Sequence, residues 1–194
     1  GTLDTHTVAI DWGDGSSNTT LSLAAGVLTF SGVSHQYLDN KLANAPYTIG
    51  VTVTDNDNAS GSASTTVTVN NVAPAVNATG STIAENGTAT VSGTIVDPGT
   101  QDTFTVVIGW GEGSPQTYSY PAGSTTFSES HQYLDDNPTA TASDTYTISV
   151  TVTDDDTGVG TASTSVTVNN VAPAVTATGS TIAENGTATV SGTI

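Results

Sequence analysis

The residues best suited to chemistry in this chain are carboxylates that gather in short polar loops. The 194-residue sequence holds 18 Asp and Glu against a single Lys or Arg, and its formal net charge is −17. Carboxylate, amide and carbonyl oxygens are the ligands that Ca²⁺ prefers, and the ion takes about six to eight of them. The alternative interpretation is that these residues form turns and keep the surface hydrated, because Asp and Asn are also common turn residues.

The histidines do not belong to a recognisable catalytic arrangement. His35 and His131 each begin the sequence HQYLD, without a nucleophile motif or an oxyanion loop nearby. Ser130 directly precedes His131, so the two side chains would point to opposite faces of one strand and could not pair. We therefore expect a structural His–Tyr pair at each position. A glycosidase would need two carboxylates in a concave pocket, whereas the acids here lie in turns, so we expect no enzyme.

The charge balance excludes several classes of partner. Lys41 is the only basic Lys or Arg side chain, so nucleic-acid binding and a basic membrane-surface helix are both excluded. No apolar run approaches the roughly 20 residues of a membrane span, and we expect any export signal to lie outside this sequence. The absence of Cys excludes disulfides and thiolate metal sites.

Internal repeats organise the chain. VAPAVNATGSTIAENGTATVSGTI at 72–95 recurs at 171–194 with one difference, and IDWGDGS at 10–16 matches IGWGEGS at 108–114. The period of about 98 residues is the size of one sandwich domain. It predicts a partial repeat at 1–71 (strands C to G), a complete repeat at 72–170, and a partial repeat at 171–194 (strands A and B). Either the sequence is a window on a longer array, or the last segment completes the first segment of another copy.

Alternating apolar and polar residues predict strands throughout the repeat. Phe104, Val106, Ile108 and Trp110 share one face of a strand, and 146–152 alternates in the same way. Threonine is β-branched and hydroxylated, which suits the solvated face. About seven strands with a Trp on the third predict an all-β fold of tandem immunoglobulin-like β-sandwiches, arranged as an elongated rod or filament.

The order of the strands determines where the acidic loops meet. Alternate loops of a sandwich share an end, so the outgoing loops of one repeat face the incoming loops of the next. The linker amides lie between them. We therefore expect Ca²⁺ at the junctions between repeats, although neither acidic turn fits the spacing of an EF-hand loop. The candidate metal ligands are Asp14, Asp39, Asn70, Asn71, Glu85, Asp97, Asp102, Asp154, Asp155 and Asp156.

Several motifs occur in the order of a known extracellular module. WGDG at 12–15, HQY at 35–37, YTIGVTVTD at 47–55 and TVTV at 66–69 resemble the polycystic-kidney-disease (PKD) repeat. The NNVAP linker and the AENG turn are similar to cadherin-type repeats. The resemblance implies an immunoglobulin-like module of a bacterial surface or adhesin-type protein, and the cadherin likeness implies Ca²⁺ between domains. The chain lacks the third linker oxygen ligand of cadherins.

These observations favour a non-enzymatic structural repeat of an extracellular fibre, stalk or adhesin, in contact with neighbouring repeats or with copies of itself. One alternative is a PKD-like spacer or a module that binds a surface glycan or a protein. That alternative requires exposed aromatic residues, for which Tyr118 and Tyr120 are better candidates than Trp12 and Trp110, which we expect in the core. A strand-exchanged filament subunit is the other alternative, and the acidic surface also fits adaptation to salt.

Overall fold

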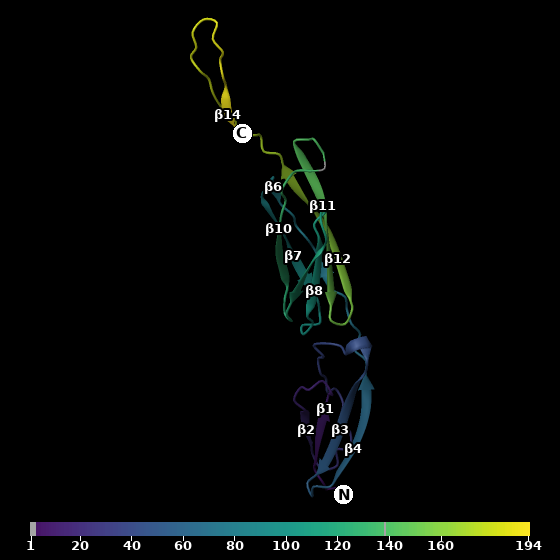
Figure 1. Ribbon diagram of the computed structural model, residues 1–194. Helices are drawn as coiled ribbons and strands as arrows, with labels where there is room; N and C mark the ends of the chain where they lie inside the picture. The colour runs from purple at the N-terminus through teal and green to yellow at the C-terminus, as the bar shows by residue number, and fades with distance from the viewer. Residues whose placement is uncertain (1–2, 138) are drawn as a thin grey trace.

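The middle of the chain, residues 72–170, forms a two-layered β-sandwich that we call the middle segment (Figure 1). The computed structural model describes residues 3–137 and 139–194. One layer has the strand order β10-β7-β5, and the other has the order β6-β12-β11-β8-β9. The strands are β5 (Ala75–Val76), β6 (Thr82–Ala84), β7 (Thr88–Val96), β8 (Phe104–Gly109), β9 (Gln116–Tyr120), β10 (Thr126–Gln132), β11 (Ser143–Asp154) and β12 (Val159–Asn169).

Between β5 and β6 the chain crosses from one layer of the sandwich to the other within a few residues. β5 pairs antiparallel with β7, whereas β6 pairs parallel with β12, with Val168 opposite Ile83. Gly80 lies between them, and a Cβ atom there would collide with the backbone carbonyl of Ser165. The chain can therefore cross from one layer to the other only where a side chain is absent.

The alternation in the sequence matches the core of the middle segment. Phe104, Val106, Ile108 and Trp110 on β8 are all buried, and so are the inward residues of β7, β11 and β12. Their polar neighbours, mostly Thr and Ser, face solvent. The all-β immunoglobulin-like class predicted from this alternation is confirmed, since inward apolar residues of both sheets form the core between them.

Residues 3–71, the first segment, form one sheet without the second layer. Its order is β2-β1-β3-β4, built from β1 (His6–Asp11), β2 (Thr19–Leu23), β3 (Tyr47–Asp55) and β4 (Ser60–Val67). These strands correspond to β8, β9, β11 and β12. A 3₁₀ turn, η1 (Leu42–Asn44), precedes β3. The first two residues of the predicted partial repeat lie outside the described residues.

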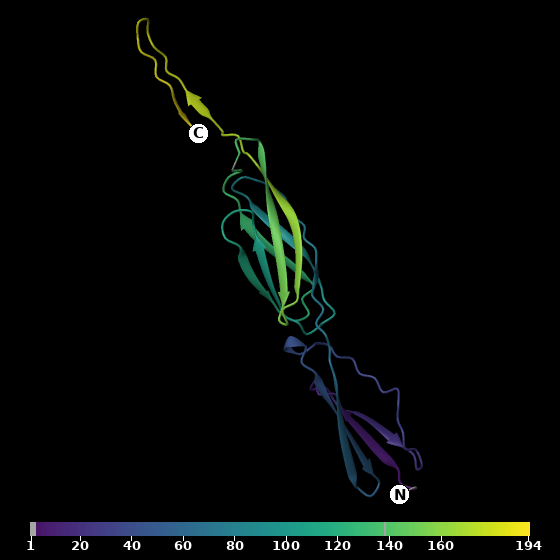
Figure 2. The ribbon, with the colours of Figure 1, turned by 90° about the vertical axis from the view of Figure 1, so that its right-hand side faces the viewer.

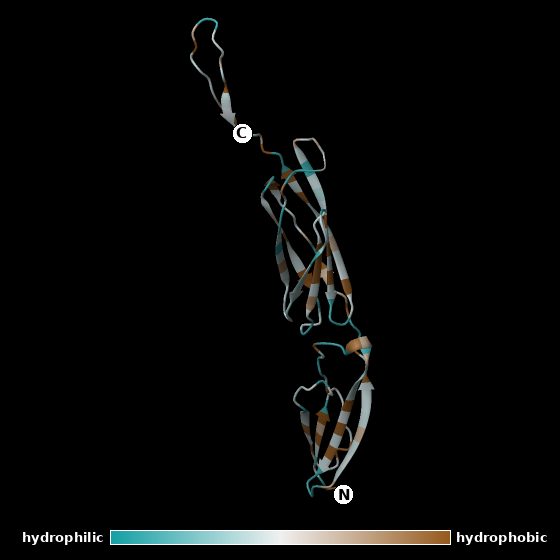
Figure 3. Ribbon diagram, viewed as in Figure 1, coloured by the Kyte–Doolittle hydropathy of each residue, from teal (hydrophilic) through white to brown (hydrophobic). Residues whose placement is uncertain are grey.

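Residues 171–194 form a two-stranded hairpin, β13 (Thr176–Thr178) with β14 (Ser191–Thr193), that we call the C-terminal hairpin. It projects from the middle segment at the end opposite to the first segment (Figures 1 and 2). All of its residues are exposed. Apolar bands recur along the strands of the first and middle segments, whereas most turns are polar, with η1 an apolar exception (Figure 3). The described part of the chain contains no helix long and apolar enough to cross a membrane.

Candidate metal centre between the first and middle segments

Carboxylates from both segments converge where β4 leads into the middle segment. One carboxylate oxygen from each of Asp39, Asp102 and Asp156 lies within 4.8 Å of the other two, and the same holds for Asp97, Asp102 and Asp154. Asp39 belongs to the loop before η1. Asp97 and Asp102 lie in the β7–β8 loop, Asp154 ends β11, and Asp156 lies in the β11–β12 loop. The two groups share Asp102, so it lies at the centre of the arrangement.

Asp102 is buried without a hydrogen-bond partner. It is 1% exposed, and neither of its carboxylate oxygens accepts a hydrogen bond. Asp39 Oδ1 and Asp97 Oδ2 are also buried without a partner. Burying unsatisfied charged oxygens is costly unless a proton or a cation compensates them. A hard divalent cation is suited to the site, because it prefers oxygen ligands of this kind.

Burial and mutual repulsion raise the pKa values of three of these carboxyl groups. Burial, followed by the charges of Asp97, Asp39 and Asp155, raises the pKa of Asp102 to about 7. Burial, together with the charges of Asp154 and Asp155, also raises the pKa of Asp97. Desolvation and the charge of Asp39 raise that of Asp156. A bound cation would counteract these shifts, because it favours the ionised carboxylates.

The linker between the segments is tied to the same site. The side-chain amide of Asn71 donates to Asp154 Oδ2 at 2.9 Å, and the backbone N–H of Asn71 donates to Asn44 Oδ1 at 2.8 Å. Asp154 Oδ1 accepts from the N–H of Gly158 at 2.6 Å. Asp154 is therefore held in place by two donors. Asn70 lines a recess between the segments together with Val72.

Three predicted ligands lie outside this centre. Asp14 accepts from the Ser16 hydroxyl at 2.6 Å and contacts His35 Nε2 at 2.6 Å, and these hydrogen bonds hold its pKa far below its usual range. Asp155 Oδ1 accepts a hydrogen bond from the N–H of Thr103 at 2.8 Å. This bond links the β11–β12 loop to the β7–β8 loop. Glu85 lies at the other end of the middle segment. The end of the segment at which each of these loops lies was predicted correctly. The order of strands does not determine the direction in which a side chain points within its loop.

Glu85 forms a second acidic group with Asp135 and Asp136, whose oxygens lie within 4.8 Å of one another. Glu85 Oε1 also accepts the N–H of Val171 at 2.7 Å, where the C-terminal hairpin begins. Asp136 Oδ2 is buried without a partner, and burial followed by the charges of Glu85 and Asp135 raises its pKa. The candidate ligands chosen from the sequence omitted Asp136, although it directly follows HQYLD.

Asn40 and Asn44 were also missed at the first junction. Asn40 is the counterpart of Asp136 and is buried, and Asn44 contacts the linker as described above. Their signal in the sequence is weak, because Asn in a loop is ordinarily a turn residue. Only the position of η1 next to the linker shows that these two residues belong to the junction and are not ordinary turn residues.

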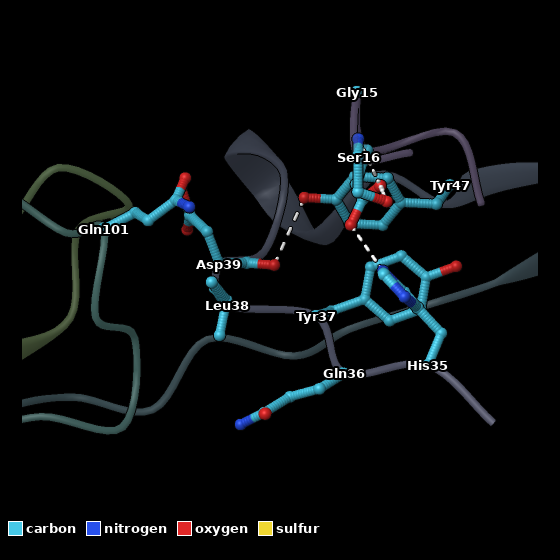
Figure 4. A pocket seen from close by; sticks show the side chains of 10 residues that line it. Gly15, Ser16, His35, Gln36, Tyr37, Leu38, Asp39, Tyr47 and Gln101 are labelled. Atoms are coloured by element: carbon cyan, nitrogen blue, oxygen red, sulfur yellow. Dashed lines mark hydrogen bonds and ion pairs between the residues drawn. The ribbon is translucent and has the colours of Figure 1, made fainter. Parts of the chain in front are cut away.

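His35 and His131 each pack between two aromatic rings. His35 stacks on Trp12 with ring centroids 4.8 Å apart. The ring of Tyr37 lies at 89° to the imidazole, with centroids 4.9 Å apart. Figure 4 shows a pocket lined by His35 and Tyr37, and Asp39 and Gln101 of the middle segment also line it. His131 repeats the arrangement on Trp110. The predicted structural His–Tyr pair is confirmed.

The aromatic residues considered for ligand binding are directed inward. Trp110 and Trp12 are buried, and Trp110 Nε1 donates to Gln116 Oε1 at 2.9 Å. Tyr118 and Tyr120 are half-buried and pack against the core. Tyr120 also donates its hydroxyl proton to Glu129 at 2.6 Å. These rings do not form the exposed aromatic cluster that the glycan-binding alternative requires.

No protein-family model and no curated protein matches the chain. It is similar in structure to the PKD domain of an M14-like peptidase from Thermoplasmatales archaeon SCGC AB-540-F20, at 23% identity and TM-score 0.43, over 52% of this chain and 99% of that one. It is similar to a tetra-tandem repeat from the extending region of a large adhesion protein, at 18% identity and TM-score 0.46, over all of this chain and 49% of that one.

A third similar structure belongs to a 1.5-MDa bacterial ice-binding adhesin, at 18% identity and TM-score 0.33, over 93% of this chain and 58% of that one. This chain therefore spans about half the length of both adhesin structures. These likenesses concern the fold alone.

Proposed function

We propose that this chain is a non-enzymatic spacer of a surface fibre, stalk or adhesin, whose junctions are stiffened by Ca²⁺. The observation that carries the proposal is Asp102, which is buried with both carboxylate oxygens unpaired between acids of two segments. Turn formation alone does not explain it, because a turn residue with this role lies at the surface and bonds its own backbone.

Asp39, Asp97, Asp102 and Asp156 would hold the ion, and Asp154 would join them from its position against Asn71. When bound, Ca²⁺ would neutralise the repulsion among these carboxylates. Asp39 is the contribution of the first segment, so the ion would restrain the angle between the two segments. Pro74 in the linker favours the same outcome, because its ring fixes φ and holds the preceding residue extended.

Such a junction suits a protein that must project a distant domain. Residues 1–71, 72–170 and 171–194 would be a partial, a complete and a partial repeat of the array. An extracellular or cell-surface location fits this role, because Ca²⁺ reaches millimolar concentrations where weak extracellular modules are filled. Neighbouring repeats or further copies of the chain would be the main partners.

The proposal is tested by titrating the 194-residue chain with CaCl₂ in isothermal calorimetry and by recording small-angle scattering in CaCl₂ and in EDTA. We expect heat of binding, a higher melting temperature in calcium and a narrower range of interdomain angles. Asp57→Asn is a matched control, because Asp57 is exposed at the distant β3–β4 turn. No heat of binding, with identical melting and scattering in both buffers, would disprove the proposal.

A further inference from the structure

The acidic centre between the first and middle segments consists of two groups of carboxylates. Asp39, Asp102 and Asp156 form the group that spans the two segments, which we call the spanning site. Asp97, Asp102 and Asp154 form the group that lies wholly in the middle segment, which we call the inner site. Asp102 is the member that the two groups share. The centre therefore offers three carboxylates at each of two positions.

Each group by itself has the dimensions of a site for one ion. Ca²⁺ lies about 2.3–2.6 Å from its oxygen ligands, so two ligands of the same ion are at most about 5 Å apart. In the spanning site and in the inner site alike, one oxygen from each carboxylate lies within 4.8 Å of the other two. Both groups therefore meet the distance limit independently.

Both sites also contain a buried oxygen that lacks a hydrogen-bond partner. This oxygen is Asp39 Oδ1 in the spanning site and Asp97 Oδ2 in the inner site. Asp102 adds two more, because neither its Oδ1 nor its Oδ2 accepts a hydrogen bond, and its side chain is 1% exposed. One ion in either site would leave the buried oxygen of the other site uncompensated, which is costly for a charged group.

The ligands of the inner site are held by turns of the middle segment. Asp97 Oδ1 accepts from the N–H of Gly99 at 2.9 Å, and Asp154 Oδ1 accepts from that of Gly158 at 2.6 Å. A Cβ atom at Gly99 would lie 2.4 Å from Asp102 Oδ2. The turn can therefore close against the Asp102 carboxylate only because residue 99 has no side chain. All three carboxylates of this site are thus positioned without help from the first segment.

The spanning site, by contrast, requires both segments. Asp39 precedes η1 in the first segment, whereas Asp156 lies in the β11–β12 loop of the middle segment. The hydroxyl of Tyr47 donates to the backbone carbonyl of Asp39 at 3.2 Å, which ties this loop to β3. An ion in the spanning site therefore links the two segments, whereas an ion in the inner site contacts carboxylates of one segment only.

We propose that this junction binds two divalent cations, which share Asp102 and have different effects. The inner ion fixes the β7–β8 and β11–β12 loops of the middle segment, and the spanning ion sets the angle between the segments. The inner ion binds more tightly, because its ligands are pre-organised within one segment. This inference rests on the proposed calcium function and adds to it the number of ions and the division of their effects.

Native mass spectrometry of the 194-residue chain in calcium acetate counts the bound ions. Asp39→Asn and Asp97→Asn should each bind one ion fewer than the wild type, and Asp102→Asn should bind two fewer. Asp57→Asn is the matched control at the distant β3–β4 turn and should bind as many as the wild type. The comparison uses differences between variants, so ions bound elsewhere on the chain do not affect it.

Calorimetric melting and small-angle scattering separate the effects of the two ions. Asp39→Asn should keep most of the rise in melting temperature that calcium gives the middle segment, but its range of interdomain angles should be the same in CaCl₂ and in EDTA. Asp97→Asn should show the opposite pattern, with a smaller rise in melting temperature and a range of angles that calcium still narrows.

Two results would overturn the two-ion inference and leave the proposed function in place. In one, Asp39→Asn, Asp97→Asn and Asp102→Asn each bind one ion fewer than the wild type, so the junction holds a single ion. In the other, Asp97→Asn loses no ion, so the inner site binds none. If none of the three variants binds fewer ions than the wild type, the calcium function of this junction is refuted as well.

Discussion

Replacing Asp102 by Asn tests the electrostatics of the junction most directly. The variant keeps the size of the side chain and removes its charge. In chelator at pH 8.5 we expect Asp102→Asn to be more stable than the wild type, which is unusual for a substitution at a buried site. The reason is that the wild-type carboxylate is ionised there among like charges and without a hydrogen-bond partner.

The magnitude follows from the pKa of Asp102. In the folded chain it is raised from 3.8 to about 7. A rise of about three pKa units, at about 1.36 kcal/mol per unit, gives about 4 kcal/mol when the group is fully ionised. Opening of the junction would hydrate the carboxylate and reduce this figure, so we expect a gain of about 2–4 kcal/mol for the variant.

The sign of the pH dependence is fixed by the direction of the shift. Well below pH 3.8, the pKa of the unfolded group, the folded and unfolded chains both bind the Asp102 proton, and the wild type and the variant should be equally stable. As the pH rises, the unfolded chain loses this proton first, so the wild type loses stability until about pH 7. The difference between the two proteins should therefore grow between pH 4 and 7 and then level off.

Urea denaturation at a series of pH values, in EDTA and in CaCl₂, measures these quantities. Calcium at 100 times its dissociation constant should stabilise the wild type by about 2.7 kcal/mol and the variant much less, because Asp102 belongs to both oxygen groups. Asp57→Asn should behave like the wild type. If Asp102→Asn is less stable than the wild type in EDTA at pH 8.5, the reasoning about uncompensated charge is refuted.

Four further substitutions test the packing. Ile95→Ala should destabilise the middle segment by about 2–5 kcal/mol, whereas Ile194→Ala should leave monomer unfolding unchanged, because these residues are 2% and 96% exposed; equal effects in urea denaturation would contradict the burial argument. Tyr133→Phe removes the 2.6 Å bond to the Trp110 carbonyl and should lower the free energy of unfolding by about 1–3 kcal/mol. His131→Ala should increase the accessibility of Trp110 to acrylamide quenching, since the imidazole stacks on that ring; unchanged quenching would show that the ring is shielded by other groups.

The strands and their inward faces could be predicted from the order of residues alone. Alternation of apolar residues with Thr is a local property of the chain, so the burial of Phe104, Val106, Ile108 and Trp110 could be predicted before any contact was known. Repetition within the chain likewise indicated which segments are equivalent, and the order of strands indicated that acidic loops of two segments would meet.

Tertiary structure decided which carboxylates face one another. Asp14 and Asp39 lie in loops at the same end of the first segment, yet Asp14 is engaged by Ser16 and His35 whereas Asp39 faces the middle segment. The loop sequences do not encode this difference, because it depends on how the linker seats one sandwich on the next. Asp102 has an ordinary turn sequence around it, and only the closure of surrounding loops removes it from water.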